Sequence, residues 1–166
     1  VYLVGYGRDA TVLRSTLATE IITLTGDNCG LMDLTLDGVS SVADSVGLLS
    51  EQQDDILLRN VMVKRFETNI IMRGGARPRF DRLSLANGTY GARFQGDTAE
   101  LRGMWWTGGV VSEHVTAGVW FEYVDQIVSH LTLAEVEFRD NLTDGLLLQG
   151  VRFAEFNDCR FDDNAR

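Results

Sequence analysis

The sequence predicts an all-β chain whose short strands stack into a parallel β-helix, and three observations lead to this fold class. Short apolar segments recur every 22 or 27 residues, a second strand recurs with them, and no stretch keeps the apolar spacing of an amphipathic helix. The 166 residues contain 17 glycines and one proline, and no Pro/Ser-rich linker divides them. We therefore expect one domain over residues 1–166, built from about six to seven coils.

The first repeat is a small or turn-forming residue followed by alternating apolar positions. It occurs five times, as Gly47-Leu48-Leu49-Ser50, Asn69-Ile70-Ile71-Met72-Arg73, Gly91-Ala92-Arg93-Phe94-Gln95, Gly118-Val119-Trp120-Phe121-Glu122 and Gly145-Leu146-Leu147-Leu148-Gln149. Side chains alternate between the two faces of a strand, so the residue after each leading position is expected to point inward. The predicted interior column is Leu48, Ile70, Ala92, Val119 and Leu146.

A second strand repeats in step with the first. Val136-Glu137-Phe138-Arg139-Asp140-Asn141 recurs 23 residues later as Cys159-Arg160-Phe161-Asp162-Asp163-Asn164, and residues 34–36, 61–63 and 83–85 are its upstream partners. The longer coils are expected to carry their extra residues around Thr107 to Thr116 and Leu131 to Ala134. A short helix is allowed for only in the residues after Ser40. Variable coil length favours a β-helix over a leucine-rich repeat, which needs a fixed leucine lattice.

Composition excludes several classes of function. The formal charge of −9 and the absence of a Lys/Arg cluster argue against a nucleic-acid partner. Cys29 and Cys159 lie near opposite ends of a stack, so both are expected to be free, buried thiols, and no Cys/His spacing indicates a metal site. No apolar run is long enough to span a bilayer, and no nucleotide-binding fingerprint is present. We expect no cofactor.

The opening resembles a known superfamily. Val1-Tyr2-Leu3-Val4-Gly5-Tyr6-Gly7-Arg8-Asp9-Ala10-Thr11-Val12-Leu13 resembles an early coil of pectate-lyase-like β-helix proteins, and Asn28-Cys29-Gly30-Leu31-Met32-Asp33-Leu34-Thr35-Leu36-Asp37-Gly38 resembles their next coil. The resemblance covers the whole chain in pattern and implies a right-handed helix. The chain begins without Met inside a β-like segment and ends where another strand is due, so we expect a fragment of a longer helix, truncated at both ends.

Two outward columns follow from the register. The first contains Leu49, Ile71, Arg93, Trp120 and Leu147, and the second contains Glu51, Arg73, Gln95, Glu122 and Gln149. The first is too apolar for an open solvent face, so we expect loops, a missing segment, partner subunits or a sugar to cover it. The second is either a structural ladder or the lining of a carbohydrate cleft, because planar polar groups bond sugar hydroxyls in pairs.

Candidate site residues come from these columns and from one unusual segment. Substrate binding is assigned to Trp120, Arg73, Arg93, Gln95 and Gln149, together with the pair Trp105-Trp106 before Gly108-Gly109. One of these two tryptophans is expected to point into the core. Glu122 and Asp125 are the candidate catalytic carboxylates, since glycoside hydrolysis needs two, although neither lies in a recognisable motif.

Two classes of function remain open. In the first, the chain is a structural, receptor-binding segment of a phage tail spike or fibre, a homotrimer that recognises a polysaccharide or cell-surface glycan. In the second, it belongs to a polysaccharide lyase, glycoside hydrolase or epimerase of the pectate-lyase-like group. Either class would act outside the cell or on a virion. The apolar outward column and the lack of a clean carboxylate pair favour the first.

Overall fold

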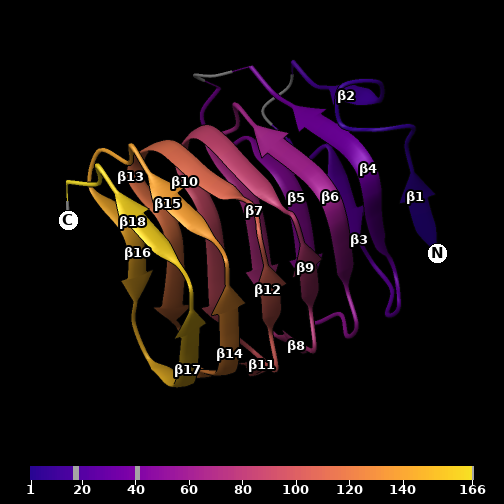
Figure 1. Cartoon of the computed structure of the whole chain (residues 1–166). Helices are drawn as coiled ribbons and strands as arrows, with labels where there is room; N and C mark the ends of the chain where they lie inside the picture. Colours follow the sequence, from indigo (N-terminus) through magenta and orange to yellow (C-terminus); the bar gives the residue numbers. More distant parts are fainter. Residues whose placement is uncertain (17–18, 40–41, 166) are drawn as a thin grey trace.

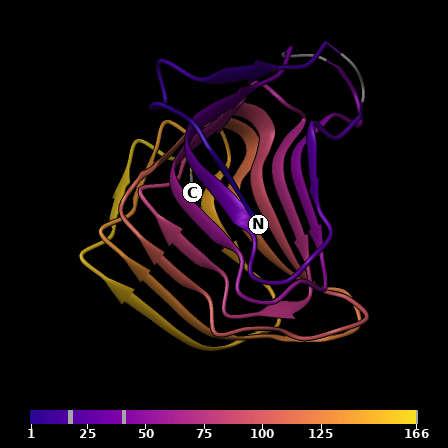
Figure 2. The ribbon, with the colours of Figure 1, turned by 90° about the vertical axis from the view of Figure 1, so that its right-hand side faces the viewer.

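The computed structural model describes residues 1–16, 19–39 and 42–165. Parallel strands coil about one axis and stack as a solenoid of about six turns, with the two termini at opposite ends of the stack (Figure 1). Figure 2, which is turned by 90° and looks along the stack, shows successive coils lying over one another. The described residues contain no helix. The predicted parallel β-helix is therefore confirmed.

The coils pass through up to four runs of parallel strands, which we name sheets A to D in chain order, and sheet B is formed only from β8 onward. Sheet A contains β3 (Ile22–Leu24), β5 (Val46–Glu51), β7 (Thr68–Arg73), the second halves of β10 (Ser84–Gly96) and β13 (Val110–Tyr123), and β16 (Asp144–Leu148). The short sheet B contains β8 (Gly75–Ala76), β11 (Leu101–Arg102) and the first halves of β14 (Val128–Ala134) and β17 (Val151–Asn157). Sheet C contains β1 (Tyr2–Val4), the first halves of β4 (Gly30–Asp37) and β6 (Leu57–Lys64), β9 (Arg79–Asp81), β12 (Trp105–Thr107) and the second halves of β14 and β17. Sheet D contains β2 (Val12–Arg14), the remaining halves of β4, β6, β10 and β13, β15 (Glu137–Arg139) and β18 (Arg160–Asp162).

The register of sheet A is the one that the sequence predicts. Leu48, Ile70, Ala92, Val119 and Leu146 pair in succession as one interior column, which Ile22 extends by one rung. The first four of these side chains are fully buried. Sheet D follows the second repeat, because Glu137, Phe138 and Arg139 pair with Arg160, Phe161 and Asp162.

The core is a column of large side chains along the axis. Trp106 is fully buried between Phe80 and Phe94, with ring centroids 5.6 Å and 6.4 Å away in edge-to-face contacts. Phe94 stacks on Phe121 of the next coil at 5.0 Å. Aromatic pairs in these geometries contribute beyond the apolar area they bury. The coils are therefore joined by side-chain stacking as well as by the backbone ladder.

Single residues with positive φ bend the chain between sheets. Asp33, Asn60 and Asp158 do so between sheets C and D, and Asn87 and Asp140 between sheets D and A. Asn and Asp tolerate this left-handed conformation better than other non-glycine residues. Residues of other types hold corners as well. Arg82 and Glu135 lie between sheets C and D, Arg65 and Glu113 between sheets D and A, and Arg77, His130 and Phe153 between sheets B and C.

A buried polar column runs inside the D–A corner. The His114 ring is fully buried, with Nδ1 2.9 Å from Oδ1 of Asn141 and Nε2 3.1 Å from Nδ2 of Asn69. Asn141 Nδ2 in turn donates to Asn164 Oδ1 at 2.7 Å. Nε2 faces an amide donor, so His114 is the neutral tautomer with its proton on Nδ1. Burial lowers the pKa of His114 to about 4, against the smaller raising effect of the hydrogen bond with Asn141.

Glycines at the start of the sheet A strands make room for this column. A Cβ on Gly91 would lie 2.2 Å from the Gly118 carbonyl oxygen and 2.9 Å from the His114 ring. A Cβ on Gly145 would meet the Asn164 amide at 2.9 Å. The leading glycines Gly91 and Gly145 are therefore explained by polar side chains at the D–A corner of the next coil, whereas a Cβ on Gly47 would meet Val63 and Phe66.

The longer coils carry only one of their extra residues where the sequence placed them, within Thr107 to Thr116. The pairing offset between β7 and β10 is 22 residues, and between β8 and β11 it is 26, so four residues are added between Gln95 and Leu101. A register shift between Gly88 and Tyr90 against β13 accounts for one more. Leu131 to Ala134 lies within β14, and most of residues 107–116 lie in β12 and β13. Four of the added residues thus occupy the A–B corner, where an excursion does not disturb the core, and the fifth lies between His114 and Ala117 at the D–A corner.

Two further expectations need correction or restriction. The helix allowed for after Ser40 begins in residues 40–41, which lie outside the described residues, and residues 42–45 form a turn closed by the Ser45 N–H donating to the Val42 carbonyl. Cys29 and Cys159 are free thiols, but both are half-buried, because they lie in coils next to the ends of the described stack.

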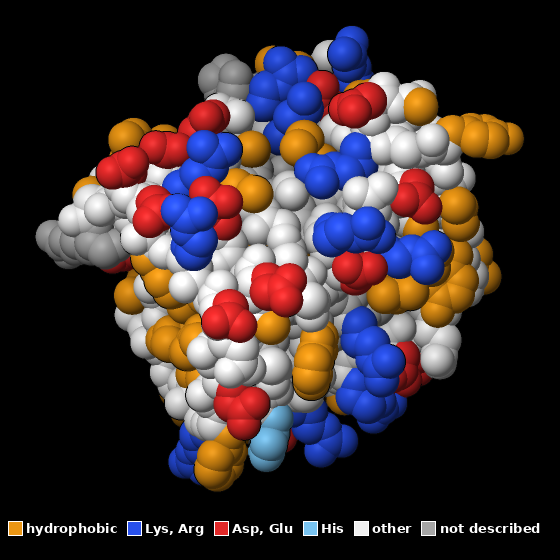
Figure 3. Space-filling model, in the orientation of Figure 1, with side chains coloured by type: hydrophobic (Ala, Val, Ile, Leu, Met, Phe, Trp, Pro, Cys, Tyr) orange, Lys and Arg blue, Asp and Glu red, His pale blue; other side chains and the backbone are white. Residues whose placement is uncertain are grey.

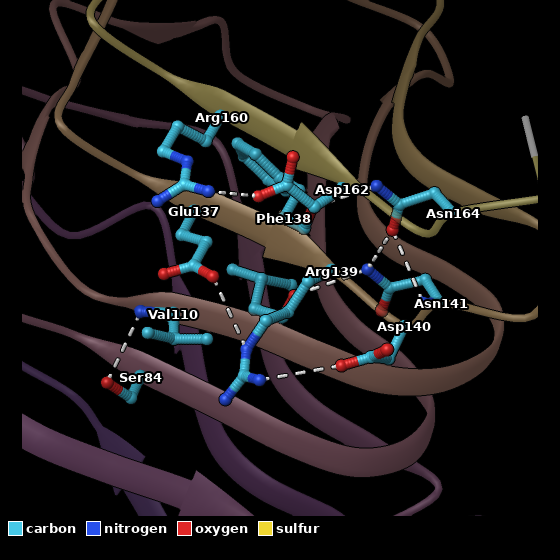
Figure 4. A network of polar contacts seen from close by, with 11 residues as sticks. Ser84, Val110, Glu137, Phe138, Arg139, Asp140, Asn141, Arg160, Asp162 and Asn164 are labelled. Carbon is cyan, nitrogen blue, oxygen red and sulfur yellow. Dashed lines mark hydrogen bonds and ion pairs between the residues drawn. The ribbon is translucent and has the colours of Figure 1, made fainter.

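The outer face of sheet D is tied together by local ion pairs near the C-terminal end (Figure 4). Arg160 contacts Asp162 at 2.7 Å, and Arg139 lies 3.5 Å from Glu137 and 3.6 Å from Asp140. All of these groups are substantially exposed. Exposed pairs of this kind contribute little to stability, and they neutralise the arginines of this face locally.

Candidate functional site on sheet A

The two predicted outward columns lie side by side on the outer face of sheet A. The pairings run from Leu49 to Ile71, Arg93, Trp120 and Leu147 in one column. In the other they run from Glu51 to Arg73, Gln95 and Glu122. The strands that hold these residues are anchored by the buried interior column, so the backbone beneath the site is rigid.

The polar column is a continuous chain of contacts. Arg73 Nη1 donates to Glu51 Oε1 at 2.6 Å, and Arg73 Nε donates to Gln95 Oε1 at 3.1 Å. Gln95 Nε2 then donates to Glu122 Oε2 at 2.7 Å. Gln95 thus bridges Arg73 and Glu122, two rungs apart. Gln149, expected as the next rung, instead accepts a hydrogen bond at 3.2 Å from the indole N–H of Trp120.

Arg93 joins the polar and apolar columns. Its Nη2 donates to Glu122 Oε2 at 2.7 Å, and its guanidinium carbon lies 5.1 Å from the centre of the Trp120 ring. The same carbon lies 5.3 Å from the centre of the Tyr90 ring. Guanidinium groups at this distance from an aromatic face are attracted by the ring quadrupole. The result is a cluster of Tyr90, Arg93, Trp120 and Glu122, which we call the Arg93 cluster.

Tyr90 was missed by sequence reasoning. It immediately precedes Gly91, at a position treated as a turn, yet it lies within β10 and its ring centre is 5.8 Å from that of Trp120. The signal available in the sequence was that Tyr90 lies three residues before Arg93, a predicted binding residue. The register of β10 against β13 was needed to connect Tyr90 with Trp120.

The charges of the Arg93 cluster are partly shielded from water. Side-chain exposure is 27% for Arg93 and 19% for Glu122, so their ion pair is screened less than the exposed pairs of sheet D. Glu122 Oε2 accepts from both Arg93 and Gln95. The geometry therefore holds Glu122 as an anionic hydrogen-bond acceptor.

The second candidate carboxylate, Asp125, belongs to the loop that follows β13. Asp125 is exposed in the loop after β13, where its backbone N–H donates to the Gly96 carbonyl at 3.0 Å. In the part of the chain that the structure describes, no contact joins Asp125 to Glu122. The assignment of Glu122 and Asp125 as a catalytic pair stays a prediction, because such carboxylates lie about 5 to 9.5 Å apart and need no direct contact.

The two adjacent tryptophans belong to sheet C instead. Trp106 is fully buried, so it offers no surface to a ligand and its assignment to substrate binding is withdrawn. The expectation that one of the pair points into the core is confirmed. Trp105 is 55% exposed on the opposite side of β12. Adjacent strand residues face opposite sides of the sheet, so the two rings do not form one shared aromatic surface.

The apolar column is only partly shielded. Ile71 is 8% exposed, whereas Leu49, Trp120 and Leu147 are half-buried. Arg93 interrupts the column and shields one side of Trp120. The face is therefore less apolar than its residue types indicate, although it still offers contact area to a sugar or to another protein.

A separate groove of about 500 Å³ lies at the D–A corner, above the buried His114 column. Its lining includes Phe66, Glu67, Asn87, Glu113 and Val115. The sequence did not predict it, because it forms where four successive coils meet at a bend. No group of three or more His, Cys, Asp or Glu side chains within the described ranges could hold a metal ion there or elsewhere.

Comparisons with known proteins bear on the fold. No protein-family model matches the sequence, and no match was found among curated proteins. Two similar solved structures are the A-modules of the mannuronan C-5 epimerases AlgE4 and AlgE6 from Azotobacter vinelandii, which are 16% and 15% identical over 95% of this chain, with TM-scores of 0.48 and 0.38. The chain spans about 60% of the length of each module. No helix long and apolar enough to cross a membrane occurs in residues 1–16, 19–39 and 42–165. The stacked parallel coils by themselves establish that the chain is a parallel β-helix.

Proposed function

We propose that the chain is a carbohydrate-recognising segment of a β-helix protein, and that the outer face of sheet A binds the glycan. The observation that carries this proposal is the Arg93 cluster with the neighbouring amides of Gln95 and Gln149. Together they place a half-buried tryptophan beside a guanidinium, a carboxylate and two amides on one sheet. An aromatic platform beside a few planar polar groups is the usual composition of a sugar site.

Each group has a distinct part in this proposal. Trp120 supplies apolar contact for the face of a sugar ring, and Gln149 fixes the indole edge through its hydrogen bond. Gln95 and Glu122 offer amide and carboxylate groups to hydroxyls, and Arg73, whose side chain is 40% exposed, is a cation for an acidic sugar. Binding would exchange some contacts within the column for contacts to the ligand, so moderate affinity is expected.

The setting in which this recognition operates is part of the proposal. A tail-spike or fibre role, with three copies packed side by side outside the cell or on a virion, would use the half-buried apolar column as a subunit contact. That arrangement predicts a concentration-dependent trimer, measured by light scattering. A monomer at all concentrations would leave the sheet A face open to a glycan and remove the trimer from the proposal.

The alternative proposal is a polysaccharide-modifying enzyme of the pectate-lyase-like group, working on the same face. It requires Glu122 to act on the reacting bond. Glu122→Gln nearly preserves shape while removing the charge, so turnover should collapse while glycan binding persists. Unchanged turnover in that variant would leave Glu122 as a binding or structural residue.

Binding is tested by isothermal titration of oligosaccharides with the wild type and two variants. Trp120→Ala should weaken binding about tenfold, which corresponds to the loss of one aromatic contact. Leu142→Ala, an exposed apolar substitution near the D–A corner, is the matched control and should bind normally. Equal affinities for the wild type and Trp120→Ala would contradict the assignment of the glycan site to sheet A.

A further inference from the structure

The groove at the D–A corner lies apart from the glycan site proposed on sheet A. It has a volume of about 500 Å³ and crosses four successive coils, from residues 42–43 to β13. Neighbouring rungs of a parallel sheet lie about 4.8 Å apart, so the groove extends about 14 Å along the stack. None of the residues that line it belongs to the Arg93 cluster.

Apolar side chains line much of this groove. Phe66 is almost fully buried at its base, Val42 is half-buried, and Val115 is 54% exposed. The apolar surface continues on the next coil to Leu142, which is 69% exposed and whose backbone N–H donates to the His114 carbonyl at 2.8 Å. Exposed valine and leucine side chains on neighbouring coils, beside a groove, offer contact area to a partner.

Two carboxylates also line the groove. Glu67 follows β6 and Glu113 lies in β13, two coils further on, which places them about 10 Å apart along the stack. Glu67 Oε2 accepts a hydrogen bond from the backbone N–H of Asp44, so this carboxylate is held in place. Glu113 is exposed, and among residues 1–16, 19–39 and 42–165 its carboxylate has no ion-pair or hydrogen-bond partner.

The negative charge of the groove is not balanced locally. No Lys or Arg of the described residues lines it. Arg65, at the same corner, contacts Asp37 through Nε and Nη2 at 2.7 Å each. On the face seen in Figure 3, which carries sheets C and D, Lys and Arg side chains lie among the acidic ones. The groove therefore combines apolar contact area with carboxylates that are complementary to a cationic ligand.

We propose that this groove binds an extended segment of another protein that carries a basic, an apolar and a basic residue at alternate positions. Alternate side chains of an extended chain face the same side, and five residues span about 13 Å, close to the length of the groove. The aliphatic stems of the two Lys or Arg residues pack on Phe66 and Val115, and their charged ends pair with Glu67 and Glu113. The apolar residue between them fills the middle of the groove. This docking is independent of glycan binding on sheet A.

The test is an NMR titration of the protein with the acetylated and amidated peptide Lys-Ser-Leu-Ser-Lys. The backbone amide signals of Gly88 and Val115 should shift, whereas those of Arg93 and Trp120 on sheet A should not. Replacing the leucine of the peptide by serine, or both lysines by glutamate, should weaken binding about tenfold. Added salt should also weaken binding, because the contribution of the charge pairs is screened.

Two substitutions identify the residues of the groove. Glu113→Gln and Val115→Thr nearly preserve side-chain size and should each weaken binding about fivefold, the effect of one lost charge pair or apolar contact. Glu155→Gln is the matched control, because it removes the same charge from an exposed position on sheet C, and it should bind the peptide normally. Circular dichroism of each variant checks that the fold is retained.

Four results would overturn the proposal. These are equal affinity for the peptide without leucine, equal weakening in Glu155→Gln and Glu113→Gln, signal shifts confined to sheet A, and a dimer that Val115→Thr dissociates. The first two would replace docking in the groove with general attraction to a chain of net charge −9. The third would place the peptide on the face proposed for the glycan, and the last would make a second copy of this chain the occupant.

Discussion

Acidification should destabilise the fold through His114. The ring is buried in the neutral form, with its two nitrogens held by Asn69 and Asn141, and burial lowers its pKa from 6.5 to about 4. Above pH 6.5 the imidazole is neutral in both folded and unfolded chains. Below that pH the His114 imidazole binds a proton in the unfolded chain but not in the folded chain, so the free energy of unfolding falls as the pH falls.

The magnitude follows from the two pKa values. Each unit of difference corresponds to about 1.4 kcal/mol, so the loss reaches about 3 kcal/mol once the pH has fallen from 6.5 to 4. This is a large part of the 5 to 15 kcal/mol that is typical of a domain, as an order-of-magnitude estimate. The pKa values of Asp37 and Asp55 lie below their usual value of 3.8, so the stability linked to those carboxylates is lost only at still lower pH.

Urea unfolding between pH 7 and pH 4.5, followed by circular dichroism, measures the effect. His114→Asn is the matched variant, because Asn141 and Asn164 occupy the same column in the following coils. Over this pH range the free energy of unfolding of the wild type should fall by about 2 kcal/mol more than that of His114→Asn. Equal losses in the two proteins, or an imidazole that titrates near 6.5 by NMR in the folded chain, would refute the reasoning.

Three further predictions concern packing and the candidate site. Trp106→Ala should reduce the free energy of unfolding by about 3 to 5 kcal/mol, because the ring fills the core between Phe80 and Phe94. A loss below about 1 kcal/mol in urea titrations would contradict that position of the ring. Gly91→Ala should lower the melting temperature far more than Gly26→Ala. A Cβ at Gly91 meets a backbone oxygen and the His114 ring, whereas a Cβ at Gly26 meets nothing within 4 Å. Equal shifts in melting temperature would count against the buried polar column at His114. Glu122→Gln should reduce the free energy of unfolding by about 1 kcal/mol, because it removes the ion pair with the partly shielded Arg93. A double-mutant cycle with Arg93→Gln that gives no coupling energy would show that this contact is not maintained in solution.

The sequence was sufficient for the fold because a solenoid repeats its own pattern. Strand alternation and a fixed period define which side chain follows which along the axis, and the columns through Ile70 and Arg93 came out as predicted. It was also sufficient to place Arg73, Gln95 and Glu122 on one outer face, since register alone decides that.

Other features were decided only by the tertiary structure, because they depend on where the chain bends. Most of the extra residues of the longer coils fall at the A–B corner, which follows from hydrogen-bond pairing and cannot be read from the spacing of the leading residues. Arg65 and Glu113 adopt left-handed corner conformations that their residue types disfavour, because the adjoining coils fix the bend. The contact of Arg93 with Trp120 and the burial of His114 between Asn69 and Asn141 arise between residues of different coils. A one-dimensional pattern specifies the rungs, whereas the side-chain contacts that make a site depend on rotamers and corners set by packing in three dimensions.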